Sequence, residues 1–143
     1  MPSINPYLAF NGNCEDAFQF YQSVFGGELM LFRFKDTPPN VAGSFPVAEN
    51  EQNRVMHVSL PIGQTVLMGF DTSESGGQTA KFGDNITINY SPDSAEDARR
   101  VFEALAEGGQ IVMPIDKVFW AELFGMLVDR FGIPWMVNFG EPQ

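Results

Sequence analysis

The stretch FWAELFGMLVDRFGIPWMVNF, residues 119–139, gives the clearest indication of the fold, because dense apolar runs lie on both sides of a short polar centre. Asp129, Arg130 and Gly132 in that centre are typical of a tight turn between two strands. We therefore predict a β-hairpin over residues 119–139.

The same kind of hairpin is predicted earlier, with strands at 54–60 and 65–70 joined around Pro61-Ile62-Gly63-Gln64. Before each hairpin the pattern predicts a strand, a capped helix and another strand. In the first half these are a strand at 4–10, a helix from Asn13 to the Gly26-Gly27 stop, and a strand at 29–34. In the second half they are a strand at 85–90, a helix after Ser94 that stops at Gly108-Gly109, and a strand at 111–115.

The two halves repeat one order of elements. Glu15-Asp16-Ala17 corresponds to Glu96-Asp97-Ala98, Gly27 to Gly109, Gly63 to Gly132, and Phe70 to Phe139. A long Pro-rich loop at 36–53 is present in the first half alone, and a polar linker spans 72–83. We predict one α+β domain, residues 1–143, built of two paired βαβββ modules at 1–78 and 79–143. Because one helix leaves one sheet face uncovered, the two modules are expected to form a cup-shaped, eight-stranded mixed sheet.

The amino-acid composition limits the kinds of molecule that the protein is expected to bind. The chain has 143 residues, of which 44% are hydrophobic, and this size suits one domain. Its 18 acidic and 8 basic residues give a net charge of −10, which would repel nucleic acid and an anionic membrane. No apolar run could span a bilayer, the first basic residue is Arg33, and Cys14 is the single cysteine. A cytoplasmic protein with no nucleic-acid or membrane partner is expected.

Three groups of motifs carry a family resemblance. They are Pro6-Tyr7-Leu8 with residues 11–17, Phe20-Tyr21 with Phe25-Gly26-Gly27, and Phe119-Trp120 followed by residues 129–135. In order and spacing they resemble the vicinal oxygen chelate superfamily, and within it the PhnB-like proteins. The resemblance implies the glyoxalase/bleomycin resistance/dioxygenase fold and a homodimer. Proteins of this group often carry a ubiquinone-related methyltransferase name, yet the sequence has no Gly-rich strand-to-helix loop for a methyl donor.

The resemblance also implies a divalent metal held by His and Glu side chains from the first and last strands of each module. The corresponding positions hold Asn5, Leu67, Asn85 and Met136, none of which is a histidine or a carboxylate. His57 is the only histidine. We therefore predict no catalytic metal and no cofactor, which disfavours glyoxalase, fosfomycin-inactivating and extradiol dioxygenase activities. Dinucleotide, P-loop and α/β-hydrolase motifs are also absent from the sequence.

Two residues are candidates for acid–base work. Strand alternation should turn His57 and Ser59 away from the helix, and imidazole exchanges protons near neutral pH. Glu122 follows the apolar pair Phe119-Trp120, where desolvation would make a carboxylate a stronger base. The plainer alternatives are a histidine that only forms hydrogen bonds and a solvated carboxylate at a strand end.

The remaining candidates would line a small-molecule site. The expected hydrogen-bonding residues are Asn5, Tyr7, Ser59, Asn85 and Thr87, and the expected apolar floor is Leu67, Phe124 and Met136. Ordinary core packing is the alternative for each. The sequence thus favours a metal-free, homodimeric PhnB-like protein that binds a small molecule of unknown identity. The alternative is a glyoxalase/dioxygenase-superfamily enzyme that acts on a small oxygenated substrate through His57 or Glu122, with or without a recruited divalent metal.

Overall fold

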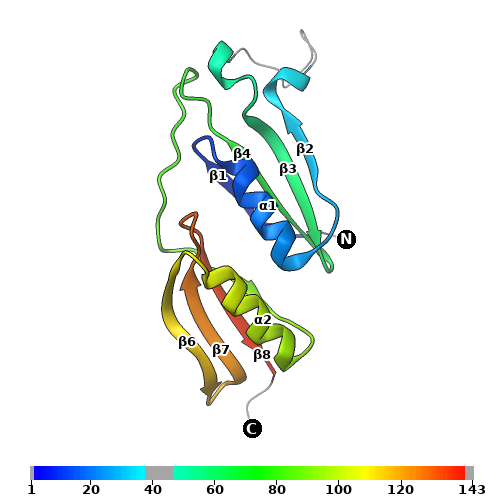
Figure 1. The fold of residues 1–143 in the computed structure, drawn as a ribbon, viewed down its shortest axis with the longest axis vertical. Coiled ribbons are helices and arrows are strands. Elements are labelled where there is room, and N and C mark those ends of the chain that lie inside the picture. Colours follow the sequence, from blue (N-terminus) through cyan, green and yellow to red (C-terminus); the bar gives the residue numbers. More distant parts are fainter. Residues whose placement is uncertain (1, 38–46, 141–143) are drawn as a thin grey trace. The chain divides into compact units, whose positions relative to one another are not determined.

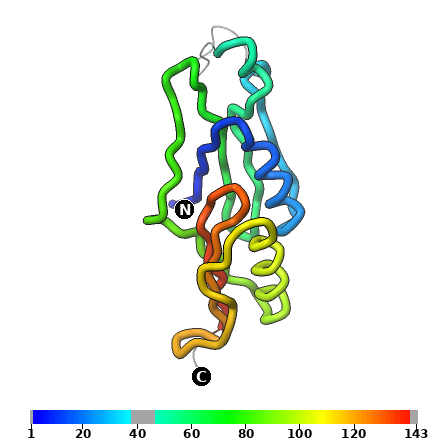
Figure 2. Tube along the Cα trace, turned by 60° about the vertical axis from the view of Figure 1, so that its left-hand side comes forward, coloured from blue at the N-terminus to red at the C-terminus, as the bar shows by residue number. Residues whose placement is uncertain are grey.

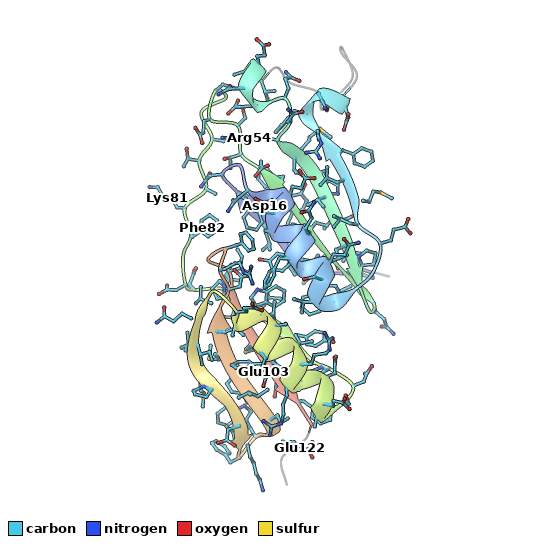
Figure 3. The ribbon with its side chains drawn as sticks, viewed as in Figure 1. Asp16, Arg54, Lys81, Phe82, Glu103 and Glu122 are labelled. Atoms are coloured by element: carbon cyan, nitrogen blue, oxygen red, sulfur yellow. The ribbon has the colours of Figure 1, made fainter. Side chains whose placement is uncertain are left out.

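The structure is a computed structural model that describes residues 2–37 and 47–140. The chain divides into two compact units, and the boundary lies between Lys81 and Phe82, within the predicted linker (Figure 3). The sequence had placed this boundary between residues 78 and 79. We call the part up to Lys81 unit 1 and the part from Phe82 unit 2.

Unit 1 is a βαβββ module with one four-stranded mixed sheet and one long helix (Figure 1). Its main elements are β1 (Tyr7–Phe10), α1 (Cys14–Phe25), β2 (Met30–Arg33), β3 (Val55–Ile62) and β4 (Thr65–Asp71). The strand order is β1-β4-β3-β2, with β1 parallel to β4 and the other neighbours antiparallel. A short 3₁₀ turn at Phe34–Asp36 (η1) leads into the predicted Pro-rich loop, and a second lies within that loop at Glu49–Glu51 (η2). Residues 38–46 lie outside the described part.

Unit 2 repeats this topology. Its elements are β5 (Ile88–Tyr90), α2 (Ala95–Ala106), β6 (Gln110–Val118), β7 (Ala121–Val128) and β8 (Pro134–Phe139). The strand order is β5-β8-β7-β6, and β5 is parallel to β8. The predicted α+β class and the pair of βαβββ modules are confirmed, and the eight strands pair as two separate four-stranded sheets.

Each helix covers one face of its own sheet (Figure 2). The ring of Phe18 on α1 packs so closely over β4 that a Cβ atom built on Gly69 would lie 2.6 Å from it. The ring of Phe102 on α2 lies over β7 in the same way, 2.6 Å from a Cβ atom built on Gly125. The absence of a side chain at these two glycines therefore lets each helix approach its sheet. We call the opposite side of each sheet its far face.

The two helices begin differently. Ser94 caps α2 as predicted, because its side-chain oxygen accepts a hydrogen bond from Asp97 N (3.0 Å). The expectation that Asn13 caps α1 through its side chain is wrong. Instead Asp71, the last residue of β4, accepts hydrogen bonds from Gly12 N (2.8 Å) and Cys14 N (3.0 Å). A buried carboxylate from a distant strand thus caps this helix.

The strands before the helices are shorter than predicted. The strand expected at 4–10 begins at Tyr7, directly after Pro6, and lies at a sheet edge, as a proline next to a strand favours. The strand expected at 85–90 is reduced to Ile88–Tyr90. In the described residues no helix is both long and apolar enough to cross a membrane.

Candidate functional site

The far face of unit 1 brings two predicted site residues into contact. The Tyr7 hydroxyl lies 2.8 Å from His57 Nδ1, and the two rings are tilted with centroids 5.6 Å apart. The Phe70 ring also contacts the Tyr7 ring, at a centroid distance of 5.5 Å. Tyr7 is thus the orienting partner of His57, which the sequence does not reveal because fifty positions separate them.

The hydroxyl of Tyr7 remains protonated over a wide pH range. Burial raises its pKa above the ordinary value, with a smaller contribution from Cys14. The hydroxyl can therefore donate to His57 Nδ1 when the imidazole is neutral, which leaves the imidazole proton on Nε2. In this arrangement the pair presents one oriented N–H donor.

Apolar side chains surround this pair. Cross-strand pairing puts Met30, Ser59 and Met68 in register with Tyr7, and puts Phe32 in register with His57. Phe70, two positions after Met68 on β4, lies on the same side of the sheet. Residues opposite one another in a sheet share a face, so these side chains belong to the far face. Ser59 thus lies where the sequence predicted it, between two methionines. Tyr7, Met30 and Phe32 are about half exposed.

The expected position of Leu67 is wrong. Leu67 is buried and pairs with Leu60, on the side of the sheet that α1 covers. The sequence comparison equated Leu67 with Met136, but the β3–β4 loop has two residues, Gly63 and Gln64, whereas the β7–β8 loop spans residues 129–133. An odd difference in loop length reverses the face of each residue after the loop, because side chains alternate along a strand. Met136 lies on the far face, opposite Met126 and Asn89.

Asn5 holds the start of β4 in place. Its Oδ1 accepts a hydrogen bond from Val66 N (3.1 Å), and its Nδ2 donates to Ser3 Oγ (3.1 Å). Asn85 and Thr87 precede β5 and lie outside the sheet, the first exposed and the second half-buried. The roles of Asn5, Asn85 and Thr87 in ligand binding stay predictions.

The far face of unit 2 carries the other predicted residues. Phe124 and Met136 lie there as expected, and Phe124 is nearly buried with its ring 5.2 Å from the centroid of Trp120. Glu122 is half-buried near the start of β7, where its Cβ lies 2.7 Å from the position that a Cβ on Gly140 would take (Figure 3). His57 and Glu122, the two acid–base candidates, belong to different units.

Asn138 is a residue that the sequence interpretation missed. It pairs with Phe124 across β7 and β8, on the far face of unit 2. Its side-chain oxygen is buried and has no hydrogen-bond partner among residues 2–37 and 47–140. The available signal was an asparagine within the otherwise apolar strand PWMVNF, because asparagine is depleted in strands.

The described residues do not fit the divalent metal that the superfamily implies. Among residues 2–37 and 47–140, no three His, Cys, Asp or Glu side chains gather to hold an ion. His57 directs Nδ1 to Tyr7, and the positions expected to supply ligands hold amide or apolar side chains. Cys14 is buried, and its pKa is raised by that burial and by the neighbouring Asp71 and Glu15. A neutral thiol is a poor ligand for such an ion.

A cavity of about 440 Å³ lies elsewhere in unit 1, at the N-terminal end of α1. Its charged groups already have partners: Arg54 donates to Thr72 O (3.0 Å) and pairs with Glu51 (3.5 Å), while Glu15 pairs with Arg33 (2.8 Å). The predicted site residues do not line it, so we place the candidate site on the far faces. The cavity is lined by Asn11, Gly12, Asn13, Glu15, Asn50, Asn53, Arg54, Val55 and Asp71.

Comparison with known proteins agrees with this architecture. The family model described as 3-demethylubiquinone-9 3-methyltransferase matches residues 2–138. Protein YjdN of Escherichia coli strain K12 is 32% identical, over 98% of this chain and 97% of its own. The crystal structure of protein PA1353 from Pseudomonas aeruginosa has a TM-score of 0.86 and 39% identity, with 98% of each chain covered.

More distant structures share the fold. The PhnB protein of Bacillus cereus has a TM-score of 0.73 at 22% identity, over 97% of this chain and 100% of its own. Proteins of the glyoxalase and bleomycin-resistance family share the fold at lower identity. The match along nearly the whole chain, together with the repeated βαβββ topology, identifies the family. The chain therefore belongs to the family described as 3-demethylubiquinone-9 3-methyltransferase, and it shares its fold with the PhnB and glyoxalase/bleomycin-resistance proteins.

Proposed function

We propose that this protein binds a small, partly apolar molecule on the far face of its sheets, without a divalent metal. The observation that carries the proposal is the Tyr7–His57 hydrogen bond (2.8 Å) on a face whose other candidate side chains, apart from Ser59, are apolar. One oriented polar pair among aromatic and thioether side chains is the usual composition of a small-molecule site. Phe70 at 5.5 Å from the Tyr7 ring supplies an aromatic wall.

Exposure of this face supports the proposal. Met30 is 58% exposed and Phe32 is 44% exposed, although both lie in a sheet strand with apolar neighbours. A contiguous apolar surface of this kind costs solvation free energy unless something covers it. The proposal includes a homodimer in the cytoplasm, for which the support is the family resemblance and the acidic, single-cysteine composition.

A second candidate function is an enzyme that moves a proton on a small oxygenated substrate. The Tyr7–His57 pair favours it, because a tyrosine that fixes the imidazole leaves the other ring nitrogen to exchange a proton with a bound molecule. Glu122 is the other proposed proton carrier. It is half-buried on the far face of unit 2.

Elemental analysis of the purified protein tests the metal-free part. We expect less than about one tenth of an equivalent of zinc, nickel, manganese or iron, because the part of the chain that the structure describes offers no adequate ligand set. Near-stoichiometric metal that survives dialysis would refute this part of the proposal.

A thermal-shift screen of small ring-bearing metabolites tests the site. A compound that binds the folded protein raises the melting temperature by mass action. We expect Tyr7→Phe and His57→Ala to reduce the shift, because the first removes the orienting hydroxyl and the second the imidazole. Tyr90→Phe is the matched control, since it removes a hydroxyl that bonds Asp97 on the helix side of unit 2. Equal ligand shifts in wild type, Tyr7→Phe and His57→Ala would remove this pair from the site.

To distinguish catalysis from binding, each compound that binds in the screen is analysed for chemical change after incubation with the protein. A binding protein returns each hit chemically unchanged. Exchange of a carbon-bound proton for solvent deuterium, lost in His57→Ala but not in Tyr90→Phe, would instead establish the enzyme.

A further inference from the structure

The far face of unit 2 contains a buried polar atom that its own unit leaves without a partner. Asn138 lies near the end of β8, opposite Phe124 on β7. The side-chain oxygen is buried, and the described residues offer it no hydrogen bond. By contrast, the nearby Asn89 on the edge strand β5 donates to Ser91 Oγ (2.9 Å) and is exposed.

Such an atom is costly to the folded protein. An amide oxygen gives up its hydrogen bonds to water when it is buried, and that free energy is not recovered without a new donor. Most buried polar atoms in native proteins are paired, so an unpaired one requires an explanation. A leucine at this position would fill a similar volume at no such cost. The asparagine is therefore better explained by a donor that arrives from outside the unit.

The surroundings define the chemistry of that donor. Phe124 beside Asn138 is 8% exposed, and its ring contacts Trp120 at a centroid distance of 5.2 Å. Met126 and Met136 form the next cross-strand pair on the same face, and both are half-buried. Rings and thioethers favour a flat apolar body, since sulfur and aromatic groups both pack well against rings.

We propose that Asn138 is a specificity-determining residue of this face, whose Oδ1 accepts a hydrogen bond from a hydroxyl or N–H group on an otherwise apolar, ring-bearing ligand. This inference rests on the proposed binding function and narrows its ligand class. It adds a second hydrogen-bond acceptor to unit 2, in addition to the Glu122 carboxylate, whereas the Tyr7–His57 pair in unit 1 presents a donor when His57 is neutral.

Three matched probes test the inference: 4-ethylphenol carries a donor, 4-ethylanisole only an acceptor, and 4-ethyltoluene neither. Affinities are measured on the full chain by amide chemical-shift titration. We expect wild type to bind the phenol about threefold to tenfold more tightly than the other two, which is the effect of one neutral hydrogen bond. In Asn138→Leu the three affinities should agree within about twofold.

The stability of the free protein provides an independent measurement. Because leucine removes the unpaired oxygen, Asn138→Leu should raise the melting temperature of the ligand-free protein by about 5 °C. Asn53→Leu is the control, since Asn53 is exposed and lies in unit 1, and it should produce no such increase. If Asn138→Leu does not fold, Asn138→Ala is used for the probe comparison.

The outcomes separate this inference from the proposed function. Probes that bind wild type with equal affinity, a preference for the anisole, or a phenol preference that survives in the Asn138 variant would each overturn the inference while the binding function stands. A folded Asn138→Leu protein that melts at or below the wild-type temperature would also overturn it. Absence of binding by all three probes, together with no hit in the metabolite screen, would refute the binding function itself.

Discussion

Replacement of Asp129 by asparagine should destabilise unit 2 through one specific hydrogen bond. Asp129 is 3% exposed and lies in the loop between β7 and β8. Its Oδ1 accepts from Phe131 N (2.8 Å) and Ile133 N (3.1 Å), and its Oδ2 accepts from Trp135 Nε1 (2.9 Å). One carboxylate thus fixes both the loop backbone and the largest buried side chain of the unit.

The magnitude follows from what asparagine can replace. Its oxygen can still accept from the two loop amides, but its NH₂ group then faces the indole N–H of Trp135, and two donors cannot bond. One hydrogen bond to a charged acceptor is lost, which costs about 2 kcal/mol. For a unit of this size, that corresponds to a decrease in melting temperature of roughly 8–16 °C.

Urea denaturation followed by tryptophan fluorescence measures this cost. Trp120 and Trp135 both belong to unit 2, so the signal reports that unit. Asp84→Asn is the matched control, because Asp84 is an exposed aspartate of the same unit. In a Trp135→Phe background, followed by circular dichroism, the Asp129→Asn cost should fall below about 1 kcal/mol, since the indole donor is gone. A cost within about 0.5 kcal/mol of zero, or one that is undiminished in that background, would show that the Asp129–Trp135 hydrogen bond does not stabilise unit 2.

Three further predictions concern single side chains. Asp71→Asn should destabilise the protein by about 2–4 kcal/mol, because the Asp71 oxygens accept three backbone hydrogen bonds, and a urea titration followed by circular dichroism measures the loss. Gly125→Ala should cost about 1–3 kcal/mol, because the new Cβ would lie 2.6 Å from the Phe102 ring; a melting temperature equal to wild type would contradict this close contact. The pKa of Tyr90 is raised from 10.0 to about 12, by burial first and then by its hydrogen bond to Asp97. Its folded-state pKa is the higher one, so the stability it contributes is complete below pH 10 and is lost as the pH rises through about 12. The tyrosinate absorbance of wild type minus that of Tyr90→Phe should have its midpoint near pH 12, and a midpoint at or below pH 10 would contradict this.

Much of the fold was predictable because its signals are local. The cap at Ser94 and the glycine stop at Gly108-Gly109 depend on nearby residues, and the α2 helix begins and ends where they indicate. The repeat of elements was visible for the same reason. The cap of α1 was not predictable, since the acceptor, Asp71, is distant in sequence and any buried aspartate could have served.

The sheet face of several candidate side chains was predictable, but their arrangement was not. Strand alternation and the repeat placed His57, Ser59 and Phe124 on the far faces, and the family resemblance placed Met136 there. Pairing of His57 with Tyr7 depends instead on the β1–β4–β3 register. Leu67 was misplaced because the repeat was aligned through two hairpin loops of different length. A strand pattern fixes a face only when the number of loop residues is known.

The cap that Asp71 supplies to α1 has a consequence for the order of folding. The contact joins the start of the helix to the last strand of the same module, so α1 lacks its cap until β4 has docked, and closing that long loop is entropically slow. Ser94 caps α2 from the adjacent residue, so this helix can gain its cap as soon as its first turn forms. Two modules with the same topology should therefore acquire their helices by different routes: in unit 2 the helix can precede the sheet, whereas in unit 1 a stable helix has to wait for it.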